Sequence, residues 1–247
     1  MADSLGHRLK IGTIVPSTNT IVQPEFASMQ PYGVTTHLSR IVTPNVSLTS
    51  DEDFKAHVHR MRDGMNEAIE RVMTSSPNCL ANGLSLEAFW DGLDGSLEMV
   101  SAIEKKFGIK CSMGNNAILK ALTILDVKNI AIITPHKPMG DEKVKKFFTE
   151  AGFNITKLSS FNINKPVEIC HVSNSALQDA IIKLDKQNPD AIVQVGTGLS
   201  MAKLAGEAWN WLNKPVIAIN TSIFWHALRE NNILDKIEGF GPLLEKY

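Results

Sequence analysis

The chain has 247 residues, of which 43% are hydrophobic and 21% are charged, and its formal net charge is −1 at pH 7. This length suits one large or two small domains, and the balanced charge argues against nucleic acid or a membrane surface as a partner. The apolar runs are too short to cross a bilayer, the N-terminus lacks the regions of a signal peptide, and the three cysteines have no motif spacing, so we expect a cytoplasmic protein.

The first half alternates predicted strands and helices. Apolar and β-branched runs bounded by Pro, Gly or Asn predict strands, and apolar residues three and four positions apart predict helices. Met61, Met65, Ile69 and Val72 form one such helical face. In chain order we expect strands at 10–15 and 33–41, a helix at 51–75, a strand at 78–82, a helix from about residue 85, a helix at about 95–107 and a strand at 109–113.

The second half repeats this order. We expect a strand at 129–134, a helix at 142–151, a strand at 153–161, a helix at 173–188, a strand at 190–195, a helix at 200–213 and a strand at 215–219. A Gly-Leu-Ser sequence follows a short apolar strand in each half, at 83–85 and at 198–200. The repetition predicts two similar halves whose loops face each other.

Alternating strands and helices favour parallel sheets with right-handed crossovers. The sequence therefore predicts an α/β protein with two pseudo-symmetric, Rossmann-like lobes and a ligand cleft between them. We assign 1–115 and 222–247 to the first lobe and 116–221 to the second, with hinges near 115–125 and 220–225. Ligands of such sheets bind beyond the carboxyl ends of the strands. Those ends are followed here by polar loops at 16–20, 82–85, 135–140 and 196–200.

The loop after the first strand carries small residues that form hydrogen bonds. Pro16 is followed by Ser17, Thr18, Asn19 and Thr20. These side chains, together with backbone amides at the start of a helix, suit a carboxylate. The same residues also suit a plain helix cap with turn residues, and the sequence alone leaves both interpretations open.

The two Gly-Leu-Ser loops offer further hydroxyl groups. Ser85 and Thr197 are candidates to act on a substrate, because a facing pair of loops can bind both ends of a small dicarboxylate. The alternative is that Ser85 and Ser200 only cap helices. The candidate substrate contacts around these loops are Asn82, Gly83, Leu84, Gly196, Gly198 and Asn220.

A histidine follows one of the predicted strand ends. His136 comes directly after Thr134 and Pro135, where it can transfer a proton near neutral pH; a solvated loop histidine is the alternative. No Walker motif, Rossmann glycine fingerprint or metal-binding histidine pair occurs, so we expect no cofactor and no metal. Trp209 and Trp211 straddle a predicted helix, and one of them is expected to pack against a lobe or a neighbouring copy in a homo-oligomer.

Five segments together resemble a known family. The segments at 15–20, 84–92, 134–136, 194–200 and 214–220 are similar, in order and over nearly the whole chain, to the maleate cis-trans isomerase and arylmalonate decarboxylase branch of the Asp/Glu racemase superfamily. The resemblance implies two α/β lobes with a small carboxylic acid between them. It also implies that Asn19 and its neighbours bind a carboxylate, and that Ser85 and Thr197 have hydrogen-bonding roles.

The chain departs from this family at the expected cysteines. The resemblance implies one cysteine at Gly196 and another within 81–84, and neither position holds one. Cys79 lies inside a predicted strand, where a buried structural thiol is the ordinary interpretation, and Cys111 and Cys170 fall away from both loops. We therefore expect a cofactor-independent isomerase or decarboxylase of a small carboxylic acid with altered chemistry. The alternatives are a non-catalytic carboxylate-binding protein and a thiol enzyme that uses Cys79.

Overall fold

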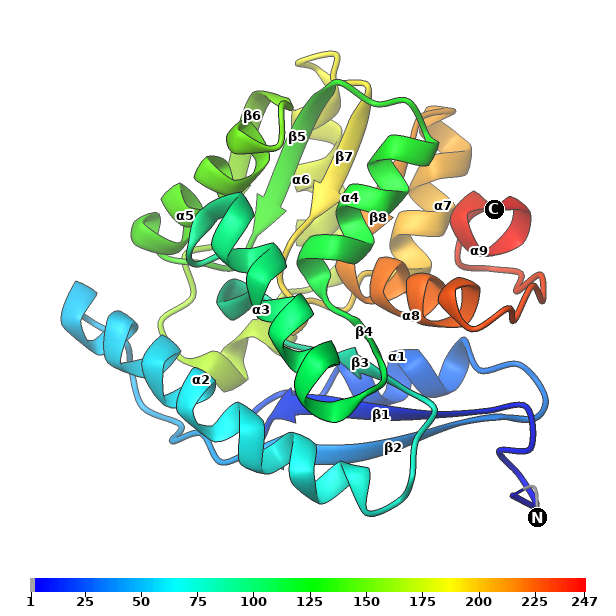
Figure 1. Ribbon diagram of the computed structural model, residues 1–247. Coiled ribbons are helices and arrows are strands. Elements are labelled where there is room, and N and C mark those ends of the chain that lie inside the picture. Colours follow the sequence, from blue (N-terminus) through cyan, green and yellow to red (C-terminus); the bar gives the residue numbers. More distant parts are fainter. Residues whose placement is uncertain (1–2) are drawn as a thin grey trace.

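The computed structural model describes residues 3–247 and consists of two four-stranded parallel sheets covered by helices (Figure 1). The first sheet has the strand order β2-β1-β3-β4 and the second has the order β6-β5-β7-β8. Both sheets thus have the same topology, which confirms the predicted two-lobed α/β fold. The strands are β1 (Leu9–Pro16), β2 (Val34–Ile41), β3 (Cys79–Asn82), β4 (Lys110–Ser112), β5 (Asn129–Thr134), β6 (Asn154–Ser160), β7 (Ala191–Gln194) and β8 (Val216–Ala218).

Helices connect the strands and cover the sheets. The α-helices are α1 (Val22–Ser28), α2 (Asp51–Met73), α3 (Gly92–Phe107), α4 (Gly114–Ile124), α5 (Pro138–Glu150), α6 (Asn174–Asp185), α7 (Ala202–Leu212), α8 (Ile219–Glu230) and α9 (Pro242–Lys246). Two short 3₁₀ helices, η1 (Leu86–Ala88) and η2 (Pro166–His171), lie in the connections that follow β3 and β6.

The helix boundaries follow the local sequence. Ser50 begins α2 with a capping box, in which its hydroxyl accepts a hydrogen bond from the Asp53 amide and the Asp53 carboxylate accepts one from the Ser50 amide. Gly108 ends α3 in a left-handed conformation with φ 71°. The predicted apolar face of α2 is buried, so this amphipathic helix covers the first sheet as its periodicity indicates.

Two predicted helices differ from the structure. The helix expected from residue 85 is only the turn η1, because the chain changes direction at Gly92, where φ is 76°. The helix expected from residue 142 begins at Pro138, because proline is well suited to the first helical position. The predicted hinges at 115–125 and 220–225 lie in α4 and α8, which pack against each other, and their role as hinges stays a prediction.

Helix α8 joins the two lobes. It follows β8 of the second sheet, yet it packs on β3 and β4 of the first sheet. Phe224, Trp225 and Leu228 on this helix are buried. In the segment that follows α8, Gly241 approaches the backbone of Gly206 in α7. The domain boundary itself stays a prediction.

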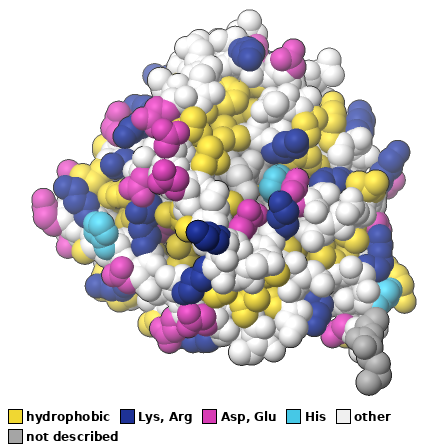
Figure 2. Space-filling view, viewed as in Figure 1, with side chains coloured by type: hydrophobic (Ala, Val, Ile, Leu, Met, Phe, Trp, Pro, Cys, Tyr) yellow, Lys and Arg dark blue, Asp and Glu magenta, His cyan; other side chains and the backbone are white. Residues whose placement is uncertain are grey.

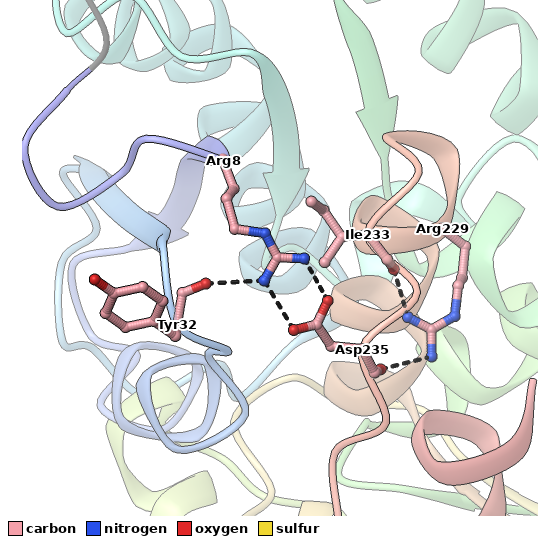
Figure 3. A network of polar contacts seen from close by, with 5 residues as sticks. All are labelled: Arg8, Tyr32, Arg229, Ile233 and Asp235. Atoms are coloured by element: carbon pink, nitrogen blue, oxygen red, sulfur yellow. Dashed lines mark hydrogen bonds and ion pairs between the residues drawn. The ribbon is translucent and has the colours of Figure 1, made fainter.

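Two arginines hold the segment that follows α8 (Figure 3). Arg8, just before β1, donates from Nη1 and Nη2 to the two carboxylate oxygens of Asp235 at 2.8 and 2.5 Å. It also donates to the carbonyl oxygen of Tyr32 at 3.0 Å. Arg229 donates to the carbonyl oxygens of Ile233 at 2.7 Å and Asp235 at 3.3 Å. The C-terminal segment is therefore fastened to the start of the first sheet.

The visible surface carries no single-sign patch. On the face drawn in Figure 2, basic and acidic side chains are interspersed, as the near-zero net charge leads one to expect. Over residues 3–247, no helix has both the length and the apolar character needed to cross a membrane. Trp209 is partly buried against the core, whereas the side chain of Trp211 is 47% exposed.

Candidate functional site

A cavity of about 80 Å³ lies between the two lobes. The sheet registers bring its loops together, because Ile14 pairs with Asn82 in the first sheet and Ile133 pairs with Gln194 in the second. The loops after β1 and β3, and those after β5 and β7, therefore leave neighbouring strand ends. The cavity is lined by Pro16, Thr18, Asn19, Thr20, Leu48, Phe54, His57, Ser85, Leu86, Glu87, Pro135, His136, Ile163, Pro166, Ile169, Cys170, Gly196, Thr197 and Gly198.

Asn19 and Thr197 join the two lobes at this cavity. The Asn19 side-chain oxygen accepts hydrogen bonds from the amides of Ile21 at 2.9 Å and Val22 at 3.0 Å, which fixes the start of α1. Its Nδ2 donates to Oγ1 of Thr197 at 3.2 Å. That hydroxyl in turn donates to the carbonyl oxygen of Gly83 at 3.0 Å. A side chain of the second lobe is thus held by two groups of the first.

A half-buried carboxylate supports the Thr197 loop from the side away from the cavity. Glu25 in α1 accepts hydrogen bonds from the amide of Ala202 at 2.9 Å and from Nδ2 of Asn220 at 2.7 Å. The same Asn220 nitrogen donates to the carbonyl oxygen of Thr197 at 3.0 Å. Desolvation raises the pKa of Glu25, which opposes the effect of its hydrogen-bond donors. Three distant segments therefore fix the position of the Thr197 loop.

Three hydroxyl groups on the cavity wall are free to bind a ligand. Thr18, Thr20 and Ser85 line the cavity, and their side chains make no hydrogen bond to any residue within 3–247. Ser85 precedes η1 without capping it through its side chain. The interpretation of Ser85 as a helix cap therefore does not apply, and its hydroxyl remains available as a donor to a carboxylate.

His136 is buried at the carboxyl end of β5, with 7% of its surface exposed. Its carbonyl oxygen accepts a hydrogen bond from the Ser160 hydroxyl at 2.6 Å, while its Nε2 atom is buried and has no partner in the described part of the chain. Burial lowers the pKa of His136 to about 4. The imidazole is therefore neutral at pH 7, where it can offer one N–H group or one lone pair.

The titration of His136 predicts a loss of stability in mild acid. The unfolded chain binds a proton to this residue below a pKa of 6.5 and the folded chain only below about 4, so the free energy of unfolding falls as the pH drops through that window. His136 contributes at most about 3 kcal/mol to this decrease in the free energy of unfolding. Urea unfolding of wild type and His136→Gln at about pH 7 and about pH 4.5 measures it.

The variant is expected to lose less stability than wild type between the two pH values. The pKa values of His57 and His226 are also lowered by burial. These two residues contribute equally to the loss of stability in wild type and in the variant. An equal loss in wild type and variant would contradict the burial of a neutral imidazole at position 136.

Gly196 cannot carry a side chain in this backbone. Its φ is +145°, and a Cβ atom there would lie 2.4 Å from Cδ and 2.7 Å from Cγ of Pro135. This is the position at which the family resemblance implies a cysteine. The loop therefore lines the cavity with its backbone and has no space for a cysteine side chain at this position.

Five residues that the sequence suggested as substrate contacts do not line the cavity. Ser17 turns away and bonds to the backbone of Thr43, its oxygen lying 2.9 Å from the Thr43 amide and 3.3 Å from the Thr43 carbonyl oxygen. The other four residues are buried and do not reach the cavity surface, because they lie at the end of β3 and at the start of α8, which are covered by neighbouring elements. They are Asn82, Gly83, Leu84 and Asn220. Gly83 and Asn220 still act on the cavity through their hydrogen bonds to Thr197.

Three titratable side chains that the sequence analysis did not select line the same cavity. His57 comes from α2, Glu87 from η1 and Cys170 from η2. Burial lowers the pKa of His57 and raises that of Glu87. The Cys170 thiol donates to the carbonyl oxygen of Val167 at 3.0 Å. One sequence feature indicates a buried carboxyl group, because Glu87 stands between Leu86 and the apolar residues 88–90.

Apolar side chains form the rest of the wall. They come from the segment before α2, from α2 itself, from η1 and from the segment around η2, and they are Leu48, Phe54, Leu86, Ile163, Pro166 and Ile169. The amide of Leu48 donates to the carbonyl oxygen of Asn164 at 2.9 Å, so the segments of the two lobes meet beside the cavity. One cavity thus combines hydrogen-bonding groups with an apolar surface.

The other two cysteines are remote from this surface. Cys79 is buried in β3 and Cys111 in β4, and neither lines the cavity. Burial raises the pKa of Cys79 to about 12, and that of Cys111 is also raised. A thiolate at Cys79 is disfavoured near neutral pH, which removes the basis for the alternative of a thiol enzyme that uses this residue.

Comparison with known proteins relates this architecture to characterised enzymes. The maleate isomerase of Geobacillus stearothermophilus is 22% identical over 254 residues, covering 97% of this chain and 98% of the relative. The structure of Nocardia farcinica maleate cis-trans isomerase bound to TRIS superposes with a TM-score of 0.86 at 20% identity, covering 96% of this chain and 98% of that one. A crystal structure of arylmalonate decarboxylase gives a TM-score of 0.75 at 21% identity, covering 95% and 98%.

The family model described as arylmalonate decarboxylase matches residues 11–244, which is nearly the whole chain. This match extends over both sheets and over every loop that lines the cavity. The chain belongs to the arylmalonate decarboxylase family.

Proposed function

We propose that the protein decarboxylates a malonate-type dicarboxylic acid that carries an apolar substituent, without a cofactor. The observation that carries this proposal is the two-sided cavity. Unpaired hydroxyls of Thr18, Thr20 and Ser85 suit carboxylate oxygens, while the side chains of Phe54 and Ile169 suit an apolar substituent. The family to which the chain belongs supports the same reaction class.

The chemistry follows from where charge develops. When the carbon–carbon bond to one carboxylate breaks, carbon dioxide leaves and the electron pair forms an enediolate with the remaining carboxylate. Preorganised donors lower the energy of such an oxyanion. Ser85, the Thr197 loop with its backbone amides, and an N–H of neutral His136 supply these donors in the cavity. This assignment keeps the hydrogen-bonding roles of Ser85 and Thr197, but it replaces the proton transfer expected of His136 with a hydrogen bond from its neutral imidazole.

The experiment is a turnover assay with phenylmalonate and, separately, with maleate, followed by proton NMR. We expect phenylacetate from phenylmalonate. Ser85→Ala should lower kcat/KM by about 10- to 100-fold through loss of one donor. Ser101→Ala is the matched control, because this serine is exposed on α3 and does not line the cavity. Thermal stabilisation by phenylmalonate without any product would instead favour a non-catalytic binding protein.

Cys170 favours a second candidate function. Its thiol lines the cavity, and a thiolate there can add to the double bond of maleate, allow rotation about the resulting single bond and leave again as fumarate forms. The assay with maleate tests this reaction. Conversion of maleate to fumarate that is lost in Cys170→Ser and after treatment with iodoacetamide would favour the isomerase, whereas decarboxylation that survives both would favour our first proposal.

A further inference from the structure

Glu87 is the single carboxyl group among the described residues that line the cavity. It lies in η1, directly after the loop that carries Ser85, and only 5% of its surface is exposed. No other described side chain donates a hydrogen bond to its carboxyl group. Its own backbone amide donates one hydrogen bond to it, which lowers the pKa of the carboxyl group, but desolvation is the larger effect and raises the pKa of Glu87. Burial therefore favours the neutral, protonated form.

The nearest cation is already engaged elsewhere. Arg62 in α2 forms an ion pair with Asp91 at 2.6 Å and donates to the carbonyl oxygen of Glu87 at 3.2 Å. Its charge lowers the pKa of the Glu87 carboxyl group, but this effect is smaller than that of desolvation. Glu87 thus lines the cavity without an ion-pair partner of its own.

The other groups of the cavity are poor proton donors to carbon. His136 and His57 are held as neutral imidazoles by burial at neutral pH, and hydroxyl groups such as that of Ser85 are much weaker acids than a carboxylic acid. The thiol of Cys170 points its proton at the carbonyl oxygen of Val167. A protonated glutamate is the stronger acid within this set.

We propose that Glu87 is the catalytic acid that protonates the α-carbon of the enediolate formed by decarboxylation. This inference rests on the proposed function and names the group that takes the place of a cysteine. Glu87 approaches the cavity from the first lobe, whereas the donors around Thr197 approach from the second. The acid therefore lies on the same side as Ser85 and on the other side of the cavity from the Thr197 loop and His136.

The step balances without a co-reactant other than water. The bond from the α-carbon to one carboxylate carbon breaks, and its electron pair passes into the enediolate as carbon dioxide leaves. The Glu87 O–H bond then breaks, and its proton forms the new bond to the α-carbon, which yields a monocarboxylate. The Glu87 carboxylate that remains takes a proton from solvent before the next turnover.

The test uses Glu87→Gln with 2-methyl-2-phenylmalonate, whose product has a stereocentre at the α-carbon. Glutamine keeps the size and polarity of the side chain but cannot deliver the proton, so kcat should fall about 100-fold or more while KM changes little. The residual product should be racemic, because water then protonates the enediolate from either face. Glu67→Gln is the matched control, since Glu67 is exposed on α2 and should leave kcat and enantiomeric excess unchanged.

A second variant guards against misfolding of the first. Glu87→Asp keeps the acid but withdraws it by one methylene, so kcat should fall about 10-fold while the enantiomeric excess is retained. Wild-type kcat and enantiomeric excess in Glu87→Gln, or an unchanged kcat in Glu87→Asp, would overturn the role of Glu87 and leave the proposed function standing. A wild-type protein that turns over neither malonate overturns both.

Discussion

Replacing Thr197 by valine is expected to lower kcat/KM for phenylmalonate about 100- to 1,000-fold, equivalent to about 2.7–4 kcal/mol of transition-state stabilisation. The Thr197 hydroxyl donates to the carbonyl oxygen of Gly83 and accepts from Asn19. Valine has the same shape but can neither donate nor accept a hydrogen bond, so the loops of the two lobes lose their shared contact beside the site proposed for the enediolate. Steady-state kinetics with the purified variant measures the effect.

Thr13→Val is the matched control for this change. Thr13 lies in β1 and is equally buried, but its hydroxyl has no hydrogen-bond partner among residues 3–247. The control should keep its activity and lose little stability, whereas Thr197→Val should also lose about 1–3 kcal/mol of unfolding free energy from unpaired buried groups. If Thr197→Val keeps wild-type kcat/KM, the loop contact is not part of the reaction.

Introducing a cysteine at Gly196 is expected to destabilise the protein by about 4 kcal/mol and to yield no gain in activity. The loss combines backbone strain at a positive φ with overpacking, since the new Cβ atom would collide with the ring of Pro135. Urea unfolding measures the stability, and the phenylmalonate and maleate assays measure the activity.

Gly108→Cys separates the two contributions. Gly108 also has a positive φ, but no atom lies within 4 Å of a Cβ built there, so this variant reports the backbone cost alone. A Gly196→Cys protein that is as stable as Gly108→Cys would show that the Pro135 loop can move aside. Gain of a cysteine-dependent activity in that protein would contradict the steric argument.

The alternation of strands and helices was sufficient to predict the two sheets, because hydrophobic periodicity reports directly on which face of an element is buried. The strand ends also located part of the site. Asn19, Ser85, His136 and Thr197 were selected because each follows a strand, and all four line one cavity. The positions of parallel strand ends are set by topology, which the sequence pattern determines.

The titratable side chains that line the cavity could not be predicted in the same way. Glu87 and Cys170 lie on 3₁₀ turns without an apolar period, and His57 lies on a long amphipathic helix. The direction of these side chains depends on how segments distant in sequence pack together. The same limit explains Ser17, whose hydroxyl pairs with Thr43 in a segment between β2 and α2.

The route by which a substrate reaches the cavity follows from the position of α8. This helix begins with Asn220 beside the Thr197 loop, packs on the first sheet and ends near the clamp formed by Arg8 and Asp235. Because α8 joins the two halves in this way, we expect it to resist their separation. We expect a small ligand to enter between the surface segments at 42–50 and 161–172, which are joined by the hydrogen bond from the Leu48 amide to the Asn164 carbonyl oxygen. We therefore expect entry to need a local movement of these segments and no separation of the two sheets.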